Sequence, residues 1–594
     1  PDVTARVLDQ LERYQHTVAS ALATIWQQLD PEARRAWQLA ACFEPESVGD
    51  RLSAAAGLDA DALHALRRRH LIDTAPDGRW RMHRLTRDFG QRAGTDADRA
   101  DARRAFVAGC AEYADEIELA DGYRLYVPER AHLDSALELA PAALGDDDER
   151  VSDLLDAIGT AVQSLGDYGR ARTLKEQALE ADLRNLGEDH PSVAIRRSNL
   201  ACVLQDLGEL REARDLLRLA LDSALRNLED DCPQVAIHRS NLACVLRDLG
   251  ELGDARELLR LALDSDLSNF GEDHSEVATK RSNLAGVLWD LGELGEAREL
   301  LRLALDSDLR HFGEGHPEVA KMRSNLACVL QELGELEEAR ELLDLAIDSD
   351  LRHFGEGHPE VAKKRSNLAD VLQDLGELEA ARELLRLALD SDLRNLGEHH
   401  PVVAGDRSSL AGVLQELGEL DEARDLLRLA LDSDLSNFGE DHPSVARSRS
   451  NLALVLWELG ELGEAGKLFR LALNSDLRNF DADHLRVAVL RSNLALVLQE
   501  LGELAEARKL FRLALDSDLR NLGEHHPSVA SSRGNLAGVL QELGELDEAR
   551  DLLRLALARM LERYGKEGHS LVPKIRGQLD ALERGMGDTR GRGG

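Results

Sequence analysis

Apolar residues recur at helical spacing through most of this chain, and the whole pattern returns every 42 residues. One copy carries apolar side chains at the three-to-four spacing of an amphipathic helix: Val319, Leu326, Val329, Leu330 and Leu333. Gly334 then interrupts the pattern, and a second apolar stripe follows. We therefore expect two helices per copy, the first from Pro317 and the second from about Glu337 to about Phe354.

The period shows no gap or insertion over residues 151–565. Its central glycine stands at the same place in ten copies: Gly166, Gly208, Gly250, Gly292, Gly334, Gly376, Gly418, Gly460, Gly502 and Gly544. An alanine follows five residues later in every copy, from Ala171 to Ala549. Because neither helix can bury its stripe alone, neighbouring copies must stack. The pattern predicts an all-α array of ten helix pairs.

Composition agrees with this expectation and limits the partners. Leu and Ala dominate and aromatic residues make up only 4% of the 594 residues, which favours helices over strands. The hydrophobic content of 43% is enough to bury a continuous core. The formal net charge of −38 repels nucleic acid and anionic membrane, and it favours a basic or amide-rich protein or peptide ligand. The alternative interpretation is that charged outer faces keep a long array soluble.

Cysteines and histidines offer no obvious chemistry. Cys202, Cys244 and Cys328 share one repeat position, and equivalent positions lie too far apart for disulfides, so we expect free thiols and a cytoplasmic protein. No apolar run is long enough for a membrane span. Eight histidines each lie in a separate loop between copies, which favours a structural role over metal binding: His190, His274, His316, His358, His400, His442, His484 and His526.

The phrase from Ser324 to Leu336, Ser-Asn-Leu-Ala-Cys-Val-Leu-Gln-Glu-Leu-Gly-Glu-Leu, resembles the tetratricopeptide repeat. The 42-residue period and the loop Gly-Glu-Asp/Gly-His-Pro are similar to the longer kinesin-light-chain type. The resemblance covers residues 151–565 and implies a right-handed superhelical solenoid whose concave groove holds peptide. We expect residues 566–585 to form a capping helix and residues 586–594 a disordered tail.

One face of the first helix carries the candidate ligand-binding residues. Lys321, Asn325, Cys328 and Glu332 share this face because they are four, three and four residues apart. The asparagine recurs in eight copies, with Ser409 as the exception: Asn199, Asn241, Asn283, Asn325, Asn367, Asn451, Asn493 and Asn535. The resemblance implies that these amides line the groove. The alternative is that each asparagine bonds a neighbouring helix.

Other positions on or beside this face vary or carry charge. The first position includes Lys321, Lys363 and Arg447, and the last is always acidic, as in Glu332 and Asp374. Trp289 and Trp457 stand where other copies carry glutamine, as at Gln331, Gln373, Gln415, Gln499 and Gln541. These tryptophans are candidates for anchoring a partner, or for packing against a neighbouring helix.

The period is absent from residues 1–150, which we divide into a domain at 1–95 and a helical connector at 96–150. Asp30 and Pro31 begin a helix, and Leu71 to His83 reads as strand, turn and strand. This segment resembles the winged-helix domain of bacterial NB-ARC/STAND signalling ATPases. Met82 and His83 match the Met-His-Asp motif of that family, whereas Arg84 departs from its aspartate. The resemblance implies nucleotide sensing by His83, provided that an ATPase domain precedes Pro1.

The chain contains no phosphate-binding loop, zinc signature or nucleophile elbow, so we expect no catalysis and no cofactor. The favoured hypothesis is a protein-binding module that serves as the sensor arm of a signalling ATPase, in a bacterial protein of which this chain is a piece. The alternatives are a free-standing scaffold and a fragment of a transcriptional regulator. The last rests on a basic cluster that could meet DNA: Arg67, Arg68, Arg69, Arg81, Arg84 and Arg87.

Overall fold

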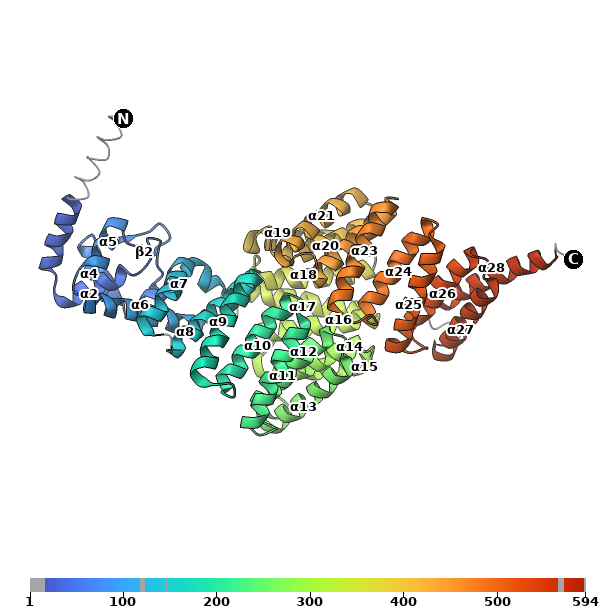
Figure 1. Ribbon diagram of the computed structural model, residues 1–594, viewed down its shortest axis with the longest axis horizontal. Helices are drawn as coiled ribbons and strands as arrows, with labels where there is room; N and C mark the ends of the chain where they lie inside the picture. The colour runs from blue at the N-terminus through green and yellow to red at the C-terminus, as the bar shows by residue number, and fades with distance from the viewer. Residues whose placement is uncertain (1–16, 118–122, 146, 565–570, 592–594) are drawn as a thin grey trace, which may run out of the picture. The chain divides into compact units, whose positions relative to one another are not determined.

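The computed structural model describes residues 17–117, 123–145, 147–564 and 571–591. It divides into two compact units. Unit 1 comprises residues 1–206 and 215–227, and unit 2 comprises residues 207–214 and 228–594. Each unit is all-α except for one small hairpin in unit 1 (Figure 1).

Unit 1 begins with helices and a hairpin in the order that the sequence predicts. Its elements are α2 (Pro31–Ala40), α3 (Asp50–Ala55), α4 (Ala60–Arg68), β1 (Asp73–Thr74), β2 (Trp80–Arg81) and α5 (Arg84–Arg92). Asp30 caps α2 as expected, because its carboxylate accepts the N–H of Ala33 at 2.7 Å. The two strands pair antiparallel, and Val48 bridges to Trp80. The aromatic rings of Trp37, Trp80 and Phe43 fill the core beneath them.

Two longer helices connect this segment to the repeats, namely α6 (Asp96–Ile117) and α7 (Tyr123–Leu144). The repeats of unit 1 contribute α8 (Glu149–Ser164), α9 (Tyr168–Leu186) and α10 (Pro191–Asp206). Helix α11 (Leu210–Asn227) has residues in both units. Ten helix pairs follow one another from α8, as the period predicts.

Unit 2 continues the alternation. We call the first helix of each pair an A helix and the second a B helix. The A helices are α12 (Pro233–Asp248), α14 (Ser275–Asp290), α16 (Pro317–Glu332), α18 (Pro359–Asp374), α20 (Pro401–Glu416), α22 (Pro443–Glu458), α24 (Leu485–Glu500) and α26 (Pro527–Glu542). The B helices are α13 (Leu252–Phe270), α15 (Leu294–Phe312), α17 (Leu336–Phe354), α19 (Leu378–Leu396), α21 (Leu420–Phe438), α23 (Leu462–Asn479), α25 (Leu504–Leu522) and α27 (Leu546–Tyr564).

Local chemistry fixes where each helix begins and ends. Pro317 occupies the first turn of α16, where a missing N–H costs nothing, and Nδ1 of His316 accepts the N–H of Glu318 at 3.2 Å. Gly334 adopts φ 77° between α16 and α17, and Gly355 adopts φ 85° after α17, a region that side chains disfavour. The loop histidines are therefore N-caps, which confirms their structural interpretation. Phe354 stacks on the His358 ring with centroids 4.0 Å apart.

Buried alanines allow the close packing that the sequence predicts. Ala339, Ala346 and Ala327 are fully buried between helices of their own and adjacent pairs. A buried arginine on each A helix from α10 to α26 also holds the preceding loop, as Nη1 of Arg323 donates to the Glu314 carbonyl at 3.1 Å. The same bond recurs at Arg197, Arg239, Arg281, Arg407, Arg449, Arg491 and Arg533. Arg365 instead pairs with the Glu356 carboxylate at 3.5 Å.

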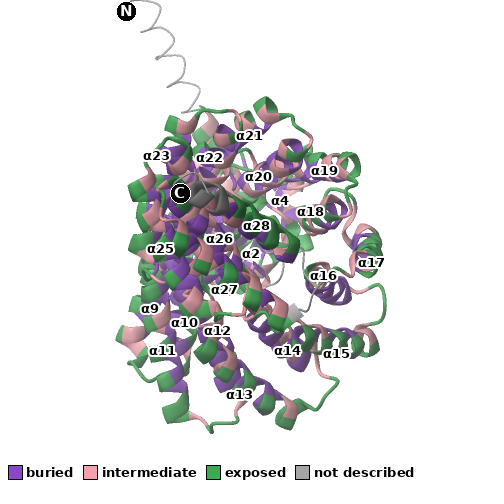
Figure 2. Cartoon of the chain, turned by 90° about the vertical axis from the view of Figure 1, so that its right-hand side faces the viewer, coloured by how far each residue is buried: buried purple, intermediate pink, exposed green. Residues whose placement is uncertain are grey.

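Consecutive B helices are joined on their outer side by ion pairs. Arg298 binds Glu335 at 2.7 Å, and Arg302 binds Glu338 at 3.0 Å. Figure 2 shows α16, α18 and α20 nearer the centre of unit 2 than α17, α19 and α21. The A helices therefore form the inner side of these repeats.

The C-terminal helix α28 (Leu571–Gly591) packs against α26 and α27. Residues 565–570 and 592–594 lie outside the described part, so the expected start of the capping helix at residue 566 does too. The helix continues to Gly591, into the segment 586–594 that we expected to be a disordered tail. Residues 1–16 of the expected N-terminal domain lie outside the described part as well. All six cysteines carry free thiols, as predicted. Within the described ranges, every helix is too short or too polar to cross a lipid bilayer.

Candidate peptide-binding face

The inner face of the A helices carries a ladder of asparagines bonded to serines. The Nδ2 of Asn283 donates to Ser240 Oγ at 2.9 Å, and that of Asn325 donates to Ser282 Oγ at 3.0 Å. Asn367 bonds Ser324 in the same way at 2.8 Å. In unit 1 the equivalent Asn199 donates to the Asp156 carboxylate at 2.7 Å. Each bond crosses to the preceding A helix, so it holds the amide in one orientation.

The asparagines are neither fully buried nor fully exposed. All eight are half-buried, including Asn241, Asn451, Asn493 and Asn535. Within the described residues, neither Asn325 nor Asn367 accepts a hydrogen bond at Oδ1. The structure therefore combines both sequence interpretations, since one N–H bonds a neighbouring helix while the carbonyl oxygen stays available. Whether a ligand uses that oxygen is still a prediction.

The remaining candidates lie around this ladder. Lys321, Lys363 and Arg447 are exposed at the first position of their A helices. Glu332 and Asp374 are exposed at the last position. Cys328 is half-buried between them, and burial raises the pKa of its thiol to about 11, so it stays protonated at neutral pH. Trp289 and Trp457 are half-buried.

A second ladder joins the C-terminal ends of the A helices. Gln331 donates its Nε2 to the Asp374 carboxylate of the next repeat at 2.5 Å. The same contact joins Gln373 to Glu416, Gln415 to Glu458 and Gln499 to Glu542, and an arginine makes it from Arg247 to Asp290. We call each of these contacts a clasp. Trp289 and Trp457 occupy the donor position at the two remaining junctions from α12 to α26.

Buried acids at the junctions were not recognised in the sequence. The B helices from α13 to α25 each carry a buried aspartate at one repeat position, and most of these aspartates meet a residue 14 positions later on the next A helix. Lys364 binds Asp350 at 2.7 Å, and Lys280 binds Asp266 at 3.3 Å. Ser448 donates instead to Asp434 at 2.6 Å. These polar groups are almost fully buried, so their pairing decides whether a junction is electrostatically satisfied.

Three junctions lack a cation or hydroxyl at this place. One of them has Leu490 there, and Arg486 binds Asp476 at 3.2 Å from a different position. The other two have no such substitute among the described residues. Met322 stands opposite Asp308, and burial raises the pKa of that carboxyl to about 6. Asp406 stands opposite Asp392, and the two carboxyl groups share a hydrogen bond. Burial, followed by repulsion from Asp406, raises the pKa of Asp392 to about 7, while burial raises that of Asp406 to about 6.

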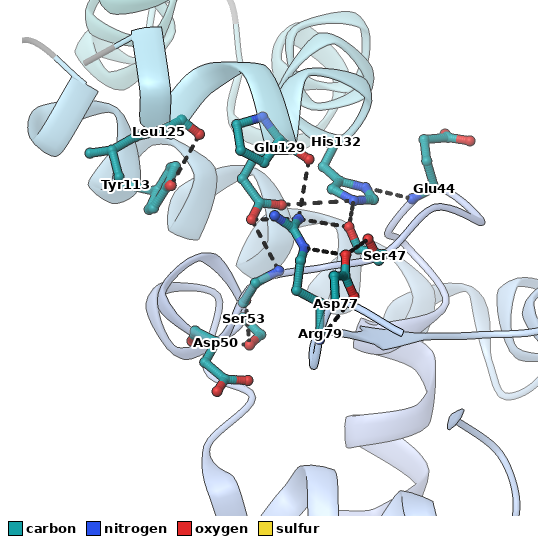
Figure 3. Close-up of polar contacts among 12 residues, drawn as sticks. Glu44, Ser47, Asp50, Ser53, Asp77, Arg79, Tyr113, Leu125, Glu129 and His132 are labelled. Carbon is teal, nitrogen blue, oxygen red and sulfur yellow. Dashed lines mark hydrogen bonds and ion pairs between the residues drawn. The ribbon is translucent and has the colours of Figure 1, made fainter. Parts of the chain in front are cut away.

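A polar network in unit 1 links the hairpin to α7 (Figure 3). Arg79 donates to the Ser47 carbonyl at 2.7 Å and binds the buried Glu129 carboxylate at 2.6 Å. His132 is fully buried, where its Nδ1 accepts the Glu44 N–H at 3.1 Å and its Nε2 lies 3.2 Å from the Ser47 carbonyl. Burial lowers the pKa of His132 to about 4, so the ring is neutral and the Nε2–H donates. These bonds join the N-terminal segment firmly to the connector.

His83 lies beside this segment and caps α5. Its Nδ1 accepts the N–H of Leu85 at 3.2 Å, and the side chain is exposed. The basic residues Arg68, Arg81 and Arg84 are exposed, whereas Arg87 is half-buried and binds Glu44 at 2.8 Å. The structure therefore leaves His83 accessible and takes Arg87 partly out of the basic cluster. Nowhere in the described part do three His, Cys, Asp or Glu side chains gather as metal ligands would.

Comparison with known families and structures follows the repeats. The sequence model of the tetratricopeptide repeat matches residues 158–226, 197–268, 276–352, 360–432, 407–478 and 486–562. A second model of the same repeat matches residues 324–395. Together these matches cover more than half of the chain. No curated protein matches the chain significantly.

Three solved structures show similarity at low sequence identity. The nearly identical TPR-like repeats of a protein named for kinesin light chain, from Podosopora anserina, are 24% identical over 35% of this chain and 98% of that one, with a TM-score of 0.31. BtubC (BKLC) from P. vanneervenii is 24% identical over 40% and 92%, with a TM-score of 0.31. A STAND protein with a tetratricopeptide repeat sensor, from Pyrococcus horikoshii, is 13% identical over 77% and 65%, with a TM-score of 0.42. Because these TM-scores are low, the fold assignment rests on the repeats themselves.

Proposed function

Because the chain belongs to the tetratricopeptide repeat family, we propose that the inner face of its A helices binds an extended segment of a protein partner. One observation carries this proposal. The Nδ2 of Asn325 and of Asn367 is tied to a serine of the preceding repeat, which leaves each Oδ1 oriented without a partner in the described residues. A row of fixed acceptors suits the N–H groups of an extended peptide backbone.

Charge on the same face supports a basic or amide-rich partner. Glu332 and Asp374 are exposed at its edge, and the whole chain carries a formal net charge of −38. Lys321 and Lys363 alternate with these acids, so individual repeats offer different side chains to a partner. We infer that the constant amides bind the peptide backbone and that the varying residues select its sequence.

The test uses the full chain and a random peptide library. Peptides selected on the wild-type chain should lose about tenfold in affinity when Asn325→Ser and Asn367→Ser are combined, because each lost hydrogen bond contributes roughly 0.5–1.5 kcal/mol. Serine is a matched replacement, since Ser409 stands at this position in another repeat. Circular dichroism must show an unchanged helix content. Undiminished affinity of every selected peptide for the double variant would end the proposal.

We further propose that this binding arm reports to a STAND-type ATPase domain, as the favoured hypothesis from the sequence holds. The observation that supports it is the network that joins Arg79, Glu129 and His132, because a sensor needs a stiff link between its binding region and its output. The exposed position of His83 is compatible with contact to a nucleotide domain. The alternative is a free-standing adaptor.

The sensor-arm and adaptor hypotheses can be distinguished by sequencing the gene upstream of the codon for Pro1. A phosphate-binding loop in the same reading frame supports the sensor arm, and purified full-length protein should then hydrolyse ATP faster when a selected peptide is present. A start codon immediately upstream supports the adaptor and removes the ATPase proposal.

A further inference from the structure

The clasp ladder is interrupted at two places, and both interruptions are tryptophans. Trp289 and Trp457 replace the donor that elsewhere binds the acid 43 residues later. We propose that Trp289 with Glu332, and Trp457 with Glu500, form two binding sites for the arginine or lysine side chains of a basic peptide. This inference rests on the proposed function, because it names the chemical class of the ligand held on the A-helix face.

The first argument is that the two acids are available. Glu332 and Glu500 are exposed, and neither has a hydrogen-bond or ion-pair partner anywhere in the described ranges. By contrast, Asp374, Glu416, Glu458 and Glu542 each accept a bond from a glutamine of the preceding repeat. Tryptophan has only an N–H donor on a large ring and does not reproduce the amide of glutamine. The substitution therefore leaves a carboxylate uncompensated at these two junctions.

The second argument is that the indole lies next to that carboxylate. A Cβ built on Gly286 would meet Nη1 of Arg247 at 2.9 Å, and one built on Gly538 would meet Nε2 of Gln499 at 3.9 Å. The side chain at the donor position of a clasp therefore contacts the next A helix. The contacted residue lies four residues before the acid of that clasp. By the equivalence of the repeats, Trp289 lies over Cys328 and beside Glu332, and Trp457 lies over Leu496 and beside Glu500.

The chemistry of this arrangement selects a cation. A guanidinium or ammonium group can lie on the indole face while it pairs with the carboxylate, and arginine suits both contacts best. Glu332 and Glu500 are also the last residues of α16 and α24, where the negative end of the helix dipole further favours a positive charge. The formal net charge of −38 attracts a basic peptide to this surface.

Packing alone does not explain the tryptophans. Glutamine stands at this position in seven other copies, so the junction itself has no need of an indole: Gln163, Gln205, Gln331, Gln373, Gln415, Gln499 and Gln541. The two sites are 168 residues apart, which is four periods of 42. One basic residue therefore binds at each site, either from a long extended segment or from two separate segments.

The experiment measures fluorescence anisotropy of a labelled ten-residue peptide of alternating arginine and glycine, with the full chain, at physiological salt. We expect Trp289→Gln and Trp457→Gln each to weaken binding about 3- to 30-fold, the range of a cation–π contact. Both variants install the residue found in other repeats, so folding should be preserved. Glu332→Gln should weaken binding to a similar extent, and a peptide with citrulline in place of arginine should not bind measurably.

A charge-matched control separates a site from general attraction between opposite charges. Glu458→Gln removes an equally exposed carboxylate that Gln415 already clasps, so it should change affinity less than twofold. The converse change, Gln415→Trp, should release Glu458 and strengthen binding about threefold or more. Equal losses in Glu458→Gln and Glu332→Gln, or no loss in the tryptophan variants, would overturn the inference.

Failure of the two cation sites can be distinguished from failure of the proposed peptide-binding function. If library peptides bind and depend on Asn325 and Asn367 but show no enrichment in arginine or lysine, the cation sites are refuted while the peptide-binding face stands. If no peptide of any composition binds the chain, both proposals fall. Enrichment of basic residues that disappears in the Trp289→Gln and Trp457→Gln double variant supports both.

Discussion

Replacing Asp406 with lysine should stabilise the junction between α19 and α20 at neutral pH. The wild-type junction brings the Asp392 and Asp406 carboxyl groups together, with only 1% and 8% of these residues exposed to solvent. At the equivalent place three repeats earlier in the sequence, Lys280 pairs with Asp266, and one repeat earlier Lys364 pairs with Asp350. Asp406→Lys therefore installs a pairing that the same fold already accommodates.

The magnitude follows from the pKa of Asp392, which is raised from 3.8 to about 7. One pH unit of pKa corresponds to about 1.4 kcal/mol, so deprotonating this pair in the folded protein costs roughly 4 kcal/mol more than in the unfolded chain. The raised pKa means that the junction is most stable below pH 4 and loses stability as the pH rises to about 7. Lysine removes this cost while a buried ion pair adds little of its own, so we expect a gain of about 2–4 kcal/mol at pH 7.

The assay is hydrogen exchange of the α19 and α20 amides between pH 4 and 8, corrected for intrinsic exchange rates. A local readout is needed because a long repeat array unfolds in parts. In the wild type, the free energy of opening these helices should fall with rising pH, and in Asp406→Lys this slope should become much shallower. The amides of α17 and α18, whose junction already contains Asp350 and Lys364, provide an internal control.

Asp406→Ser is the matched control variant, because Ser448 makes this contact with Asp434 in the next repeat. It removes one carboxyl group without adding a cation, and it should recover most of the gain. If exchange from α19 and α20 in Asp406→Lys is as fast as in the wild type at pH 7, the carboxyl pair is not the source of strain. A wild-type opening free energy that does not change between pH 4 and 7 would refute the reasoning in the same way.

Three further predictions concern single junctions. Met322→Lys should pair with Asp308, lower the pKa of that carboxyl from about 6 in an NMR titration, and stabilise α15 and α16 by about 1–3 kcal/mol at pH 7. An unchanged pKa would contradict this prediction. Ala339→Leu should cost about 1–3 kcal/mol in urea unfolding, because Ala339 is fully buried and a larger side chain overpacks the junction; an unchanged midpoint would show that the junction has spare room. His358→Ala should cost about 1 kcal/mol through loss of the N-cap of α18, visible as faster exchange of its first-turn amides, whereas equal protection would assign the capping to another group.

The repeat architecture could be predicted closely because its signals are local and occur ten times. From the recurring proline and glycine, we predicted that α16 begins at Pro317, as observed, and that α17 begins within one residue of its observed start at Leu336. The buried aspartates also left a signal in the sequence. Asp350 and Lys364 are 14 residues apart, and comparing this spacing across copies would have shown that Asp392 meets another acid.

Other features depend on how elements pack and could not be read from spacing alone. The bond from Asn325 to Ser282 joins residues 43 apart, so it depends on the register of one A helix against the next. Glu129 and His132 belong to a helix outside the repeats. Their partners Arg79 and Glu44 are 50 and 88 residues away in sequence. Without a repeated pattern, nothing in the sequence marked those two side chains as buried.

The shared register of the helix pairs bears on how this protein can evolve. Because one junction closely resembles the next, recombination between misaligned copies of the gene can delete or add a whole pair and still leave every boundary complementary. Each such event changes the length of the array by one helix pair, and an event between Trp289 and Trp457 changes the distance between those two side chains by the same step. The array can therefore change in length to suit partners of different size while every junction between neighbouring helix pairs stays the same.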